Sequence, residues 1–178
     1  MTIKPLDIEN EAKCQFVEDL YISAFPPEER RPLRKVYDLY NDSSPYSIEL
    51  VENEKEQAVG FITHWDFYRF VYVEHFAISG KCRNSGFGQK AMYQFINKID
   101  HRPVVLEVEP ANSDMAKRRI GFYQRLGFTL WDQVAYQQPP YIQQGNYLPM
   151  YLMSTGNIDV SADSRLIIDT LYQKVYGV

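Results

Sequence analysis

The chain has 178 residues, of which 45% are hydrophobic, 24% charged and 15% aromatic, and its formal net charge is −4. This length suits one domain with a substantial core, the negative charge argues against nucleic-acid binding, and no apolar run approaches the roughly 20 residues of a membrane span. Because the two cysteines and three histidines lack metal-ligand spacing and residues 1–14 lack a signal-peptide pattern, we expect a cytoplasmic protein without a metal or a disulfide framework.

The first half of the chain predicts helices followed by strands. Apolar residues at helical spacing predict a helix within 7–25, and the proline-led, charged stretch 26–40 predicts a second helix or a surface segment. Runs rich in β-branched and aromatic residues predict strands at 46–52, 58–68 and 70–78. Because a polar turn separates the first two strands, we expect an antiparallel meander.

The second half alternates between the two types of element. A helix is expected from Gly86 to about Ile99, and an almost continuously apolar strand at 104–110. The next helix has Ser113 or Asp114 as its N-cap and Gly127 as its C-terminal stop. Strands are then expected at 128–137 and 147–154, joined by the long connection 139–146, and a last helix at 161–177.

The stretch "AISGKCRNSGFGQKAMYQFI", residues 77–96, joins a strand to a helix through a glycine-containing basic loop. Such a loop suits an anion, because the first N–H groups of a helix lack intrahelical partners. A P-loop is excluded, since Gly-Gln-Lys-Ala stands where Gly-Lys-Ser/Thr is required. The glycine spacing also fits a dinucleotide-binding site, with Glu107 about 20 residues further along the chain. Two features disfavour this site: loop 79–85 separates the strand from the first glycine, and the strands form a meander where that fold needs βαβ repeats. A glycine-permitted tight turn remains an alternative for the loop alone.

Two motifs together resemble those of a known family. Arg83-x-x-Gly86-x-Gly88 is similar to the first signature of the GNAT superfamily of acetyl-CoA-dependent N-acetyltransferases, and "RRIGFYQRLGF", residues 118–128, to the second. A single expected strand lies between their helices, as in the family. The chain departs from the common pattern at Ala116 and Arg119, where many members carry Asn and Ala, which puts an Asn contact to coenzyme A in doubt.

The resemblance implies a fold and an activity. The expected fold is α/β (α+β), with a mixed, twisted sheet of six to seven strands and helices on both faces. We expect a single domain over 1–178, with 157–178 as a C-terminal helical extension, and a homodimer is one assembly to consider. The implied function is transfer of the acetyl group of acetyl-CoA to a primary amine of a small molecule or peptide. A non-catalytic acyl-CoA sensor is the alternative.

The resemblance also implies cofactor-binding residues. Arg83 and the backbone N–H groups that follow it would hold the pyrophosphate, while the end of the preceding strand would pair with the pantetheine amides. The residues concerned are Phe76, Ala77, Ile78, Arg83, Asn84, Ser85, Gly86, Phe87 and Gly88. Lys81 and Lys90 would add positive charge, or simply be solvated.

Two residues are the expected catalytic groups. The resemblance makes Tyr123 the acid that protonates the leaving thiolate, although it also falls on the apolar face of its helix. Glu74 is the expected base: strand alternation places it on the side of Phe76 and Ile78, and apolar neighbours would raise its pKa. Glu107 and Glu109 on the next strand are competitors, and a structural or solvated role for Glu74 stays open.

Overall fold

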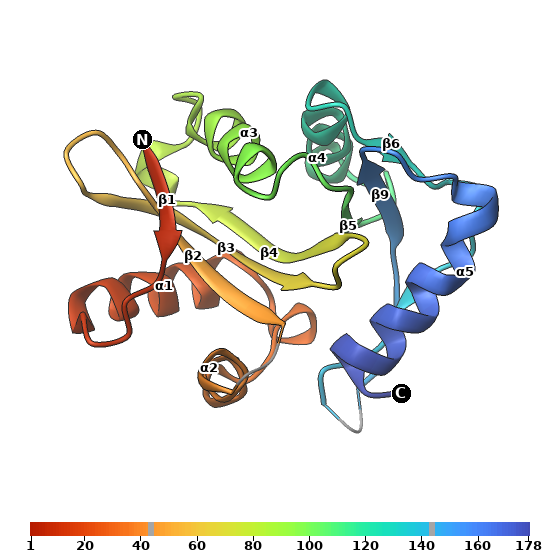
Figure 1. Cartoon of the computed structure of the whole chain (residues 1–178), viewed down its shortest axis with the longest axis horizontal. Coiled ribbons are helices and arrows are strands. Elements are labelled where there is room, and N and C mark those ends of the chain that lie inside the picture. Colours follow the sequence, from red (N-terminus) through yellow and green to blue (C-terminus); the bar gives the residue numbers. More distant parts are fainter. Residues whose placement is uncertain (43–44, 143–144) are drawn as a thin grey trace.

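The computed structural model describes residues 1–42, 45–142 and 145–178. Its main sheet has seven strands in the order β1-β2-β3-β4-β5-β9-β6, and a separate two-stranded sheet pairs β7 with β8. Helices α3 and α4 cover one face of the main sheet, and α1 and α2 the other (Figure 1). The predicted mixed sheet with helices on both faces is confirmed.

The N-terminal half forms the predicted meander. Helices α1 (Glu11–Ala24) and α2 (Leu33–Asn41) precede the strands β2 (Tyr46–Glu52), β3 (Ala58–Asp66) and β4 (Val71–Ile78). The three strands pair antiparallel in sequence order, as expected from the polar turn between the first two. The short edge strand β1 (Thr2–Pro5) was not predicted; three of its four residues are exposed, so it has no apolar alternation.

The C-terminal half differs from prediction in its strands. Helices α3 (Phe87–Lys98) and α4 (Asp114–Arg125) and strand β5 (Val104–Val108) lie where expected, and Ser113 caps α4. The strand expected at 128–137 is wrong over most of its length, because only β6 (Thr129–Leu130) and the first residue of β7 (Gln137–Gln138) fall within it.

The chain then returns to the main sheet. The strand expected at 147–154 divides into β8 (Leu148–Pro149) and β9 (Tyr151–Thr155), and the expected connection 139–146 includes residues 143–144, which lie outside the described part. Helix α5 (Val160–Thr170) continues into the π-helical turn η3 (Leu171–Tyr176). Within the described residues, no helix combines the length and apolar character needed to cross a membrane.

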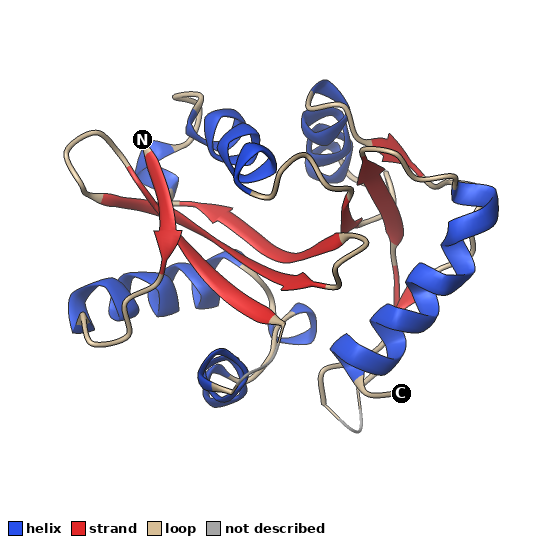
Figure 2. Cartoon of the chain, in the orientation of Figure 1, coloured by secondary structure: helices blue, strands red, loops and turns tan. Residues whose placement is uncertain are grey.

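The sheet separates two hydrophobic cores, and Figure 2 shows the helices on either side of it. One core lies under α3 and α4 and includes Val73, Met92 and Ile120. The other lies under α1, α2 and the C-terminal helix and includes Tyr21 and Trp131. A side chain on the sheet therefore belongs to one core or the other according to its face.

Two irregularities of β4 position the site. It pairs with the parallel strand β5 only from Val71 to Val73, and after that point the two strands diverge (Figure 1). In the pairing with β3, the register skips Glu74, since Thr63 pairs with His75 but His64 with Val73. This is a β-bulge, which adds one residue to β4 and reverses the alternation of its faces beyond it.

Candidate active site

A cavity of about 540 Å³ opens where β4 and β5 diverge. Its walls come from the edge of β4, from residues 82–89 and from α4. We call residues 82–89 its loop end. We call Glu74, Glu107 and the side chains hydrogen bonded to these two carboxylates its carboxylate end.

The loop end presents unpaired backbone donors. No N–H group from Asn84 to Gln89 donates to another group in the described chain. Gly86 is the N-cap of α3 with φ +75°, a left-handed conformation that lets the chain turn into the helix without a side-chain cap. Asn84 has φ 61°, so the loop contains two left-handed residues. A row of N–H groups at a helix N-terminus suits the oxygens of a phosphate.

Most of the residues predicted for cofactor binding border this cavity. The loop contributes Arg83, Asn84, Gly86, Phe87 and Gly88, and the β4 edge contributes Phe76, Ala77 and Ile78. Ser85 does not line it; its hydroxyl lies 3.5 Å from the carbonyl oxygen of Arg83. The guanidinium of Arg83 donates from Nε to the carbonyl oxygen of Ile78 at 3.2 Å, which ties the loop to the strand end.

Three arginines of α4 also line the cavity, and the sequence reasoning did not single them out as functional. Arg118, Arg119 and Arg125 come from the charged stretch that precedes and follows Tyr123. Arg119 forms an ion pair with Glu109 at 2.9 Å. The charge run in "KRRIGFYQR" was the available signal, because arginines on a cavity wall add positive potential for an anionic ligand.

Tyr123 borders the cavity from α4. Its side chain is largely buried and packs against the rings of Phe122 and Phe128 at 5.1 and 5.4 Å, so it belongs to the core as the alternative interpretation held. Burial raises the pKa of Tyr123 to about 12, and its hydroxyl makes no hydrogen bond within the described residues. The phenol therefore stays protonated and available as a proton donor.

Glu74 differs from expectation in its orientation. The bulge turns its side chain away from Phe76 and Ile78, which pack in the core under α3 and α4. Instead it lies beside His75, with Oε2 3.8 Å from Nδ1. The alternation rule failed because one inserted residue exchanges the two faces.

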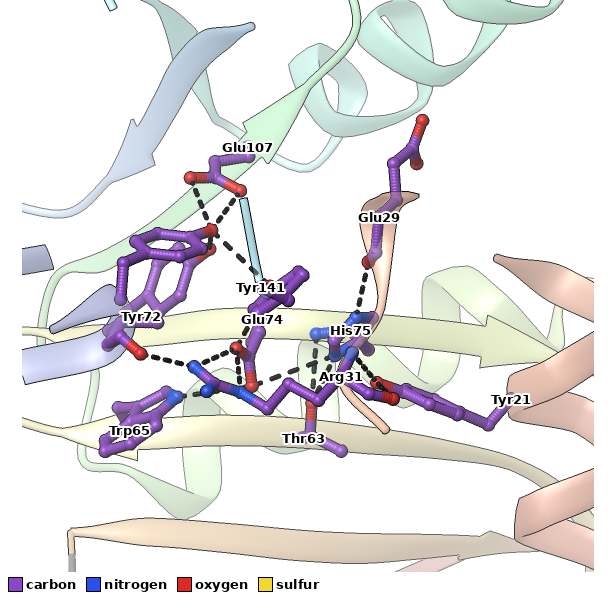
Figure 3. A network of polar contacts seen from close by, with 12 residues as sticks. Tyr21, Glu29, Arg31, Thr63, Trp65, Tyr72, Glu74, His75, Glu107 and Tyr141 are labelled. Atoms are coloured by element: carbon purple, nitrogen blue, oxygen red, sulfur yellow. Dashed lines mark hydrogen bonds and ion pairs between the residues drawn. The ribbon is translucent and has the colours of Figure 1, made fainter. Parts of the chain in front are cut away.

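The predicted raised pKa of Glu74 is also wrong. Burial alone would raise it, but the guanidinium of Arg31 lies 2.9 Å from Oε1 and the net pKa is lowered. Trp65 Nε1 and the Tyr141 hydroxyl also donate to the carboxylate, at 3.3 and 3.0 Å. Figure 3 shows Glu74 surrounded by these polar groups. A carboxylate in such surroundings is a weak proton acceptor.

Glu107 has the property expected of Glu74. Burial raises its pKa to about 7, in spite of hydrogen bonds that oppose the shift. Tyr136 and Tyr176 donate these bonds, the latter from 3.0 Å to Oε1 and 2.9 Å to Oε2. A carboxyl group that titrates near neutral pH can take up a proton and release it again.

The cation at the carboxylate end was not predicted. Arg31 follows α1 and sits between the rings of Trp65 and Tyr141, 5.5 and 4.7 Å from their centroids. Its Nη2 also donates to the carbonyl oxygen of Val175 at 2.5 Å. These partners are 34 to 144 residues away in the chain, so no local pattern could indicate the contacts. Among the residues described, no cluster of three or more His, Cys, Asp or Glu is placed to hold a metal.

The chain is similar to known proteins in sequence and in fold. Residues 14–128 match the family model described as the acetyltransferase (GNAT) family. An acetyltransferase of the GNAT family from Bacteroides thetaiotaomicron has a structure with a TM-score of 0.94 and 40% sequence identity, covering 100% of this chain and 99% of that one. The search of curated proteins gave no match.

More distant structures share the fold alone. The ribosomal-protein-S18-alanine N-acetyltransferase of Escherichia coli has 18% identity and a TM-score of 0.61, over 86% of this chain and 92% of that one. The spermidine N-acetyltransferase of Vibrio cholerae, in complex with CoA and spermine, has 14% identity and a TM-score of 0.64, over 86% and 93%. From the family match and the full-length relative, the chain belongs to the GNAT family of acetyltransferases.

Proposed function

We propose that the protein transfers the acetyl group of acetyl-CoA to a primary amine of a small molecule or peptide. The observation that carries the proposal is the composition of one cavity. It combines unpaired N–H groups, an open strand edge and two protonatable side chains whose pKa values burial has raised. Family membership supports the acetyltransferase activity, and the named activities of the more distant structures support an amine as acceptor.

The loop end would hold the phosphates of acetyl-CoA. The backbone N–H groups of Asn84 to Gln89 supply donors, and Arg83 with the α4 arginines supplies positive charge. The edge of β4 from Phe76 to Ile78 has no parallel partner among the described strands, so its backbone can pair with the pantetheine amides. The CoA complex of the spermidine N-acetyltransferase supports this cosubstrate.

The chemical step needs one group that accepts a proton and one that donates a proton. The amine lone pair forms a C–N bond with the thioester carbonyl carbon, and an N–H of the β4 edge stabilises the resulting oxyanion. When the carbonyl re-forms, the C–S bond breaks and Tyr123 gives its proton to the thiolate. Before the attack, Glu107 takes one proton from the ammonium group, directly or through one water molecule, which frees the lone pair. The nitrogen loses a second proton to solvent water as the amide forms. Exchange with solvent then deprotonates Glu107 and reprotonates Tyr123, so that one proton is released per turnover.

We assign the base to Glu107 in place of Glu74. Both carboxylates border the cavity, but the ion pair with Arg31 lowers the pKa of Glu74 while burial raises that of Glu107 to about 7. A base is most effective when its pKa lies near the working pH. Glu74 then has the structural role that the sequence left open, as the partner of a buried cation.

The test measures binding and turnover separately. Calorimetry gives the affinity for acetyl-CoA, and chromatography follows CoA release with spermidine, lysine and an alanyl peptide as acceptors. We expect amine-dependent release that falls in Glu107→Gln, with unchanged acetyl-CoA affinity. Binding without amine-dependent release would favour an acyl-CoA sensor, and a protein that binds neither acetyl-CoA nor CoA would contradict the proposal.

A further inference from the structure

The C-terminal segment, residues 157–178, lies beyond the part that matches the family model and is assigned no role by it. In the structure α5 changes into the π-helical turn η3, which ends at Tyr176 and is followed by Gly177 with φ 75°. Leu171 and Val175 of this turn are buried in the core under α1 and α2. The segment is therefore packed firmly enough to hold a side chain in one place. π-Helical turns are rare and are found disproportionately at functional sites.

Tyr176 is the residue that this segment places at the carboxylate end. Its hydroxyl lies 3.0 and 2.9 Å from the two oxygens of Glu107, 3.2 Å from the hydroxyl of Tyr72 and 3.4 Å from that of Tyr141. A phenol has one proton to donate, and an ionised carboxylate can only accept. Tyr176 therefore donates to Glu107 and accepts from Tyr72, because Tyr141 donates to Glu74.

The backbone beside Tyr176 and the ring of this residue are held by other residues of the carboxylate end. The carbonyl oxygen of Val175 accepts a hydrogen bond from Arg31, which is paired with Glu74. The ring of Tyr176 packs against that of Tyr141 with centroids 5.2 Å apart. Figure 3 shows the polar groups from Glu107 through Tyr141 and Glu74 to Arg31 as one network. The C-terminal turn thus connects two carboxylates that come from different strands.

We propose that Tyr176 is a positioning residue for the acetyl-transfer site: it orients the Glu107 carboxylate and stabilises its ionised form, so that the C-terminal segment completes the site. The inference rests on the proposed function, because it acts through the base assigned there. A hydrogen bond to a charged acceptor favours the charged form. Loss of the Tyr176 hydroxyl should therefore leave Glu107 protonated at neutral pH.

Several ionisable groups face Glu107 and affect its pKa. The strand opposite, β9, contributes only Leu152 at the paired position. The other elements contribute Tyr72 and Glu74 from β4, Tyr136 and Tyr141 from the loops, and Tyr172 and Tyr176 from η3. Glu74 opposes ionisation of Glu107, while Tyr136, Tyr176 and Tyr72 favour it. Tyr176 is the donor that lies within hydrogen-bonding distance of both carboxylate oxygens.

The experiment reads the titration of Glu107 without relying on turnover. The protein is labelled with glutamate carrying ¹³C at the side-chain carboxyl, and the Glu107 signal is assigned by its loss in Glu107→Gln. We expect its midpoint to move up by about one pH unit in Tyr176→Phe. Tyr172→Phe is the matched control from the same turn. The Tyr172 hydroxyl donates to the carbonyl oxygen of Gln137 at 2.8 Å, so the midpoint of Glu107 should not move in this variant.

Turnover gives a second reading. In Tyr176→Phe the acidic limb of the profile of kcat/KM against pH should move by the same amount, a roughly tenfold loss at pH 6 that largely disappears at pH 9. 3-Fluorotyrosine at position 176, a stronger hydrogen-bond donor, should move the midpoint downwards. This substitution keeps the ring, so it tests the idea even if Tyr176→Phe folds poorly.

Two results would overturn the inference. One is a Glu107 midpoint that is equal in wild type, Tyr176→Phe and the fluorotyrosine protein; the other is an equal shift in Tyr172→Phe. Failure of the proposed function looks different, because the wild type would then release no CoA with any amine while the carboxyl titration still responded to Tyr176.

Discussion

The loop end of the cavity is made by a short stretch of backbone, whereas the carboxylate end is made by side chains from β3, β4, β5, the loops and the C-terminal turn. Residues 84–89 offer N–H groups whose direction follows from two left-handed residues and a helix start. Glu74 and Glu107 instead depend on Arg31, Tyr141 and Tyr176, which reach them only in the folded chain. The loop end therefore depends on local conformation, and the carboxylate end depends on tertiary packing.

The largest effect should follow from removing the buried cation. Arg31→Met leaves the Glu74 side chain, which is 0% exposed, as an uncompensated charge. The free energy of unfolding should fall by about 3–5 kcal/mol, measured by urea denaturation. The control is Arg165→Met, whose pair with Asp169 is exposed and spans 3.9 Å, with an expected loss of under ~1 kcal/mol.

Restoring neutrality should recover part of that loss. In Arg31→Met with Glu74→Gln no buried charge is left unpaired, so the double variant should be more stable than Arg31→Met alone. A double variant that is equally unstable would contradict the view that the carboxylate end is held together by charge.

The next effect is a dependence of stability on pH. The pKa of Glu107 is raised from 4.5 to about 7 in the folded chain, so between these values the folded state keeps a proton that the unfolded state has lost. The free energy of unfolding should therefore fall as pH rises through this window, by about 3 kcal/mol. Urea denaturation at pH 5 and pH 8 measures the fall, and Glu107→Gln should remove it.

This dependence separates stability from catalysis. Glu107 accepts a proton only when ionised, so activity should rise with pH over the window in which stability falls. The same slope in wild type and Glu107→Gln would show that burial does not perturb this carboxyl group.

A third effect tests Tyr123, which borders the cavity from α4. Tyr123→Phe removes the proposed proton donor but no hydrogen bond within the described residues, and it keeps the ring contacts with Phe122 and Phe128. We expect kcat to fall about 100-fold with little change in acetyl-CoA affinity or unfolding free energy. Tyr93→Phe, at a half-exposed tyrosine of α3, is the control. Unchanged kcat would leave Tyr123 as a core residue alone.

The same contrast explains what the sequence could predict. Helical spacing and capping residues predicted α3 and α4 because their signals are local, as with Ser113 at the start of α4. Runs rich in β-branched and aromatic residues predicted β2, β3 and β4, yet the bulge at Glu74 is a single inserted residue with no signal in the composition of the strand. The glycine-containing loop was predicted to bind an anion from its residues, and its unpaired N–H groups support that interpretation.

The carboxylate end could not be predicted in this way. Whether Glu74 or Glu107 has the raised pKa depends on which of them lies beside Arg31, and their separation from it in the chain is 43 and 76 residues. The strand expected at 128–137 failed for a related reason: its apolar residues Trp131 and Tyr136 are buried in the core under α1, α2 and the C-terminal helix, although neither of them belongs to a strand. An apolar pattern predicts that residues are buried, but only the folded structure determines which residues they pack against.

The smallest effect should come from the backbone of the loop end. Gly86 has φ +75°, and a Cβ placed there meets no atom within 4 Å, so Gly86→Ala acts through conformation alone. Alanine disfavours this region by roughly 1–2 kcal/mol, so the unbound loop should relax and turn its N–H groups away. Acetyl-CoA binding must then reverse the relaxation, and its Kd should rise about fivefold in calorimetry. Gly80→Ala is matched, because its Cβ also meets nothing within 4 Å but its φ is not positive, and its Kd should stay unchanged. Equal Kd values for the two variants would mean that the left-handed turn does not direct the N–H groups toward the ligand.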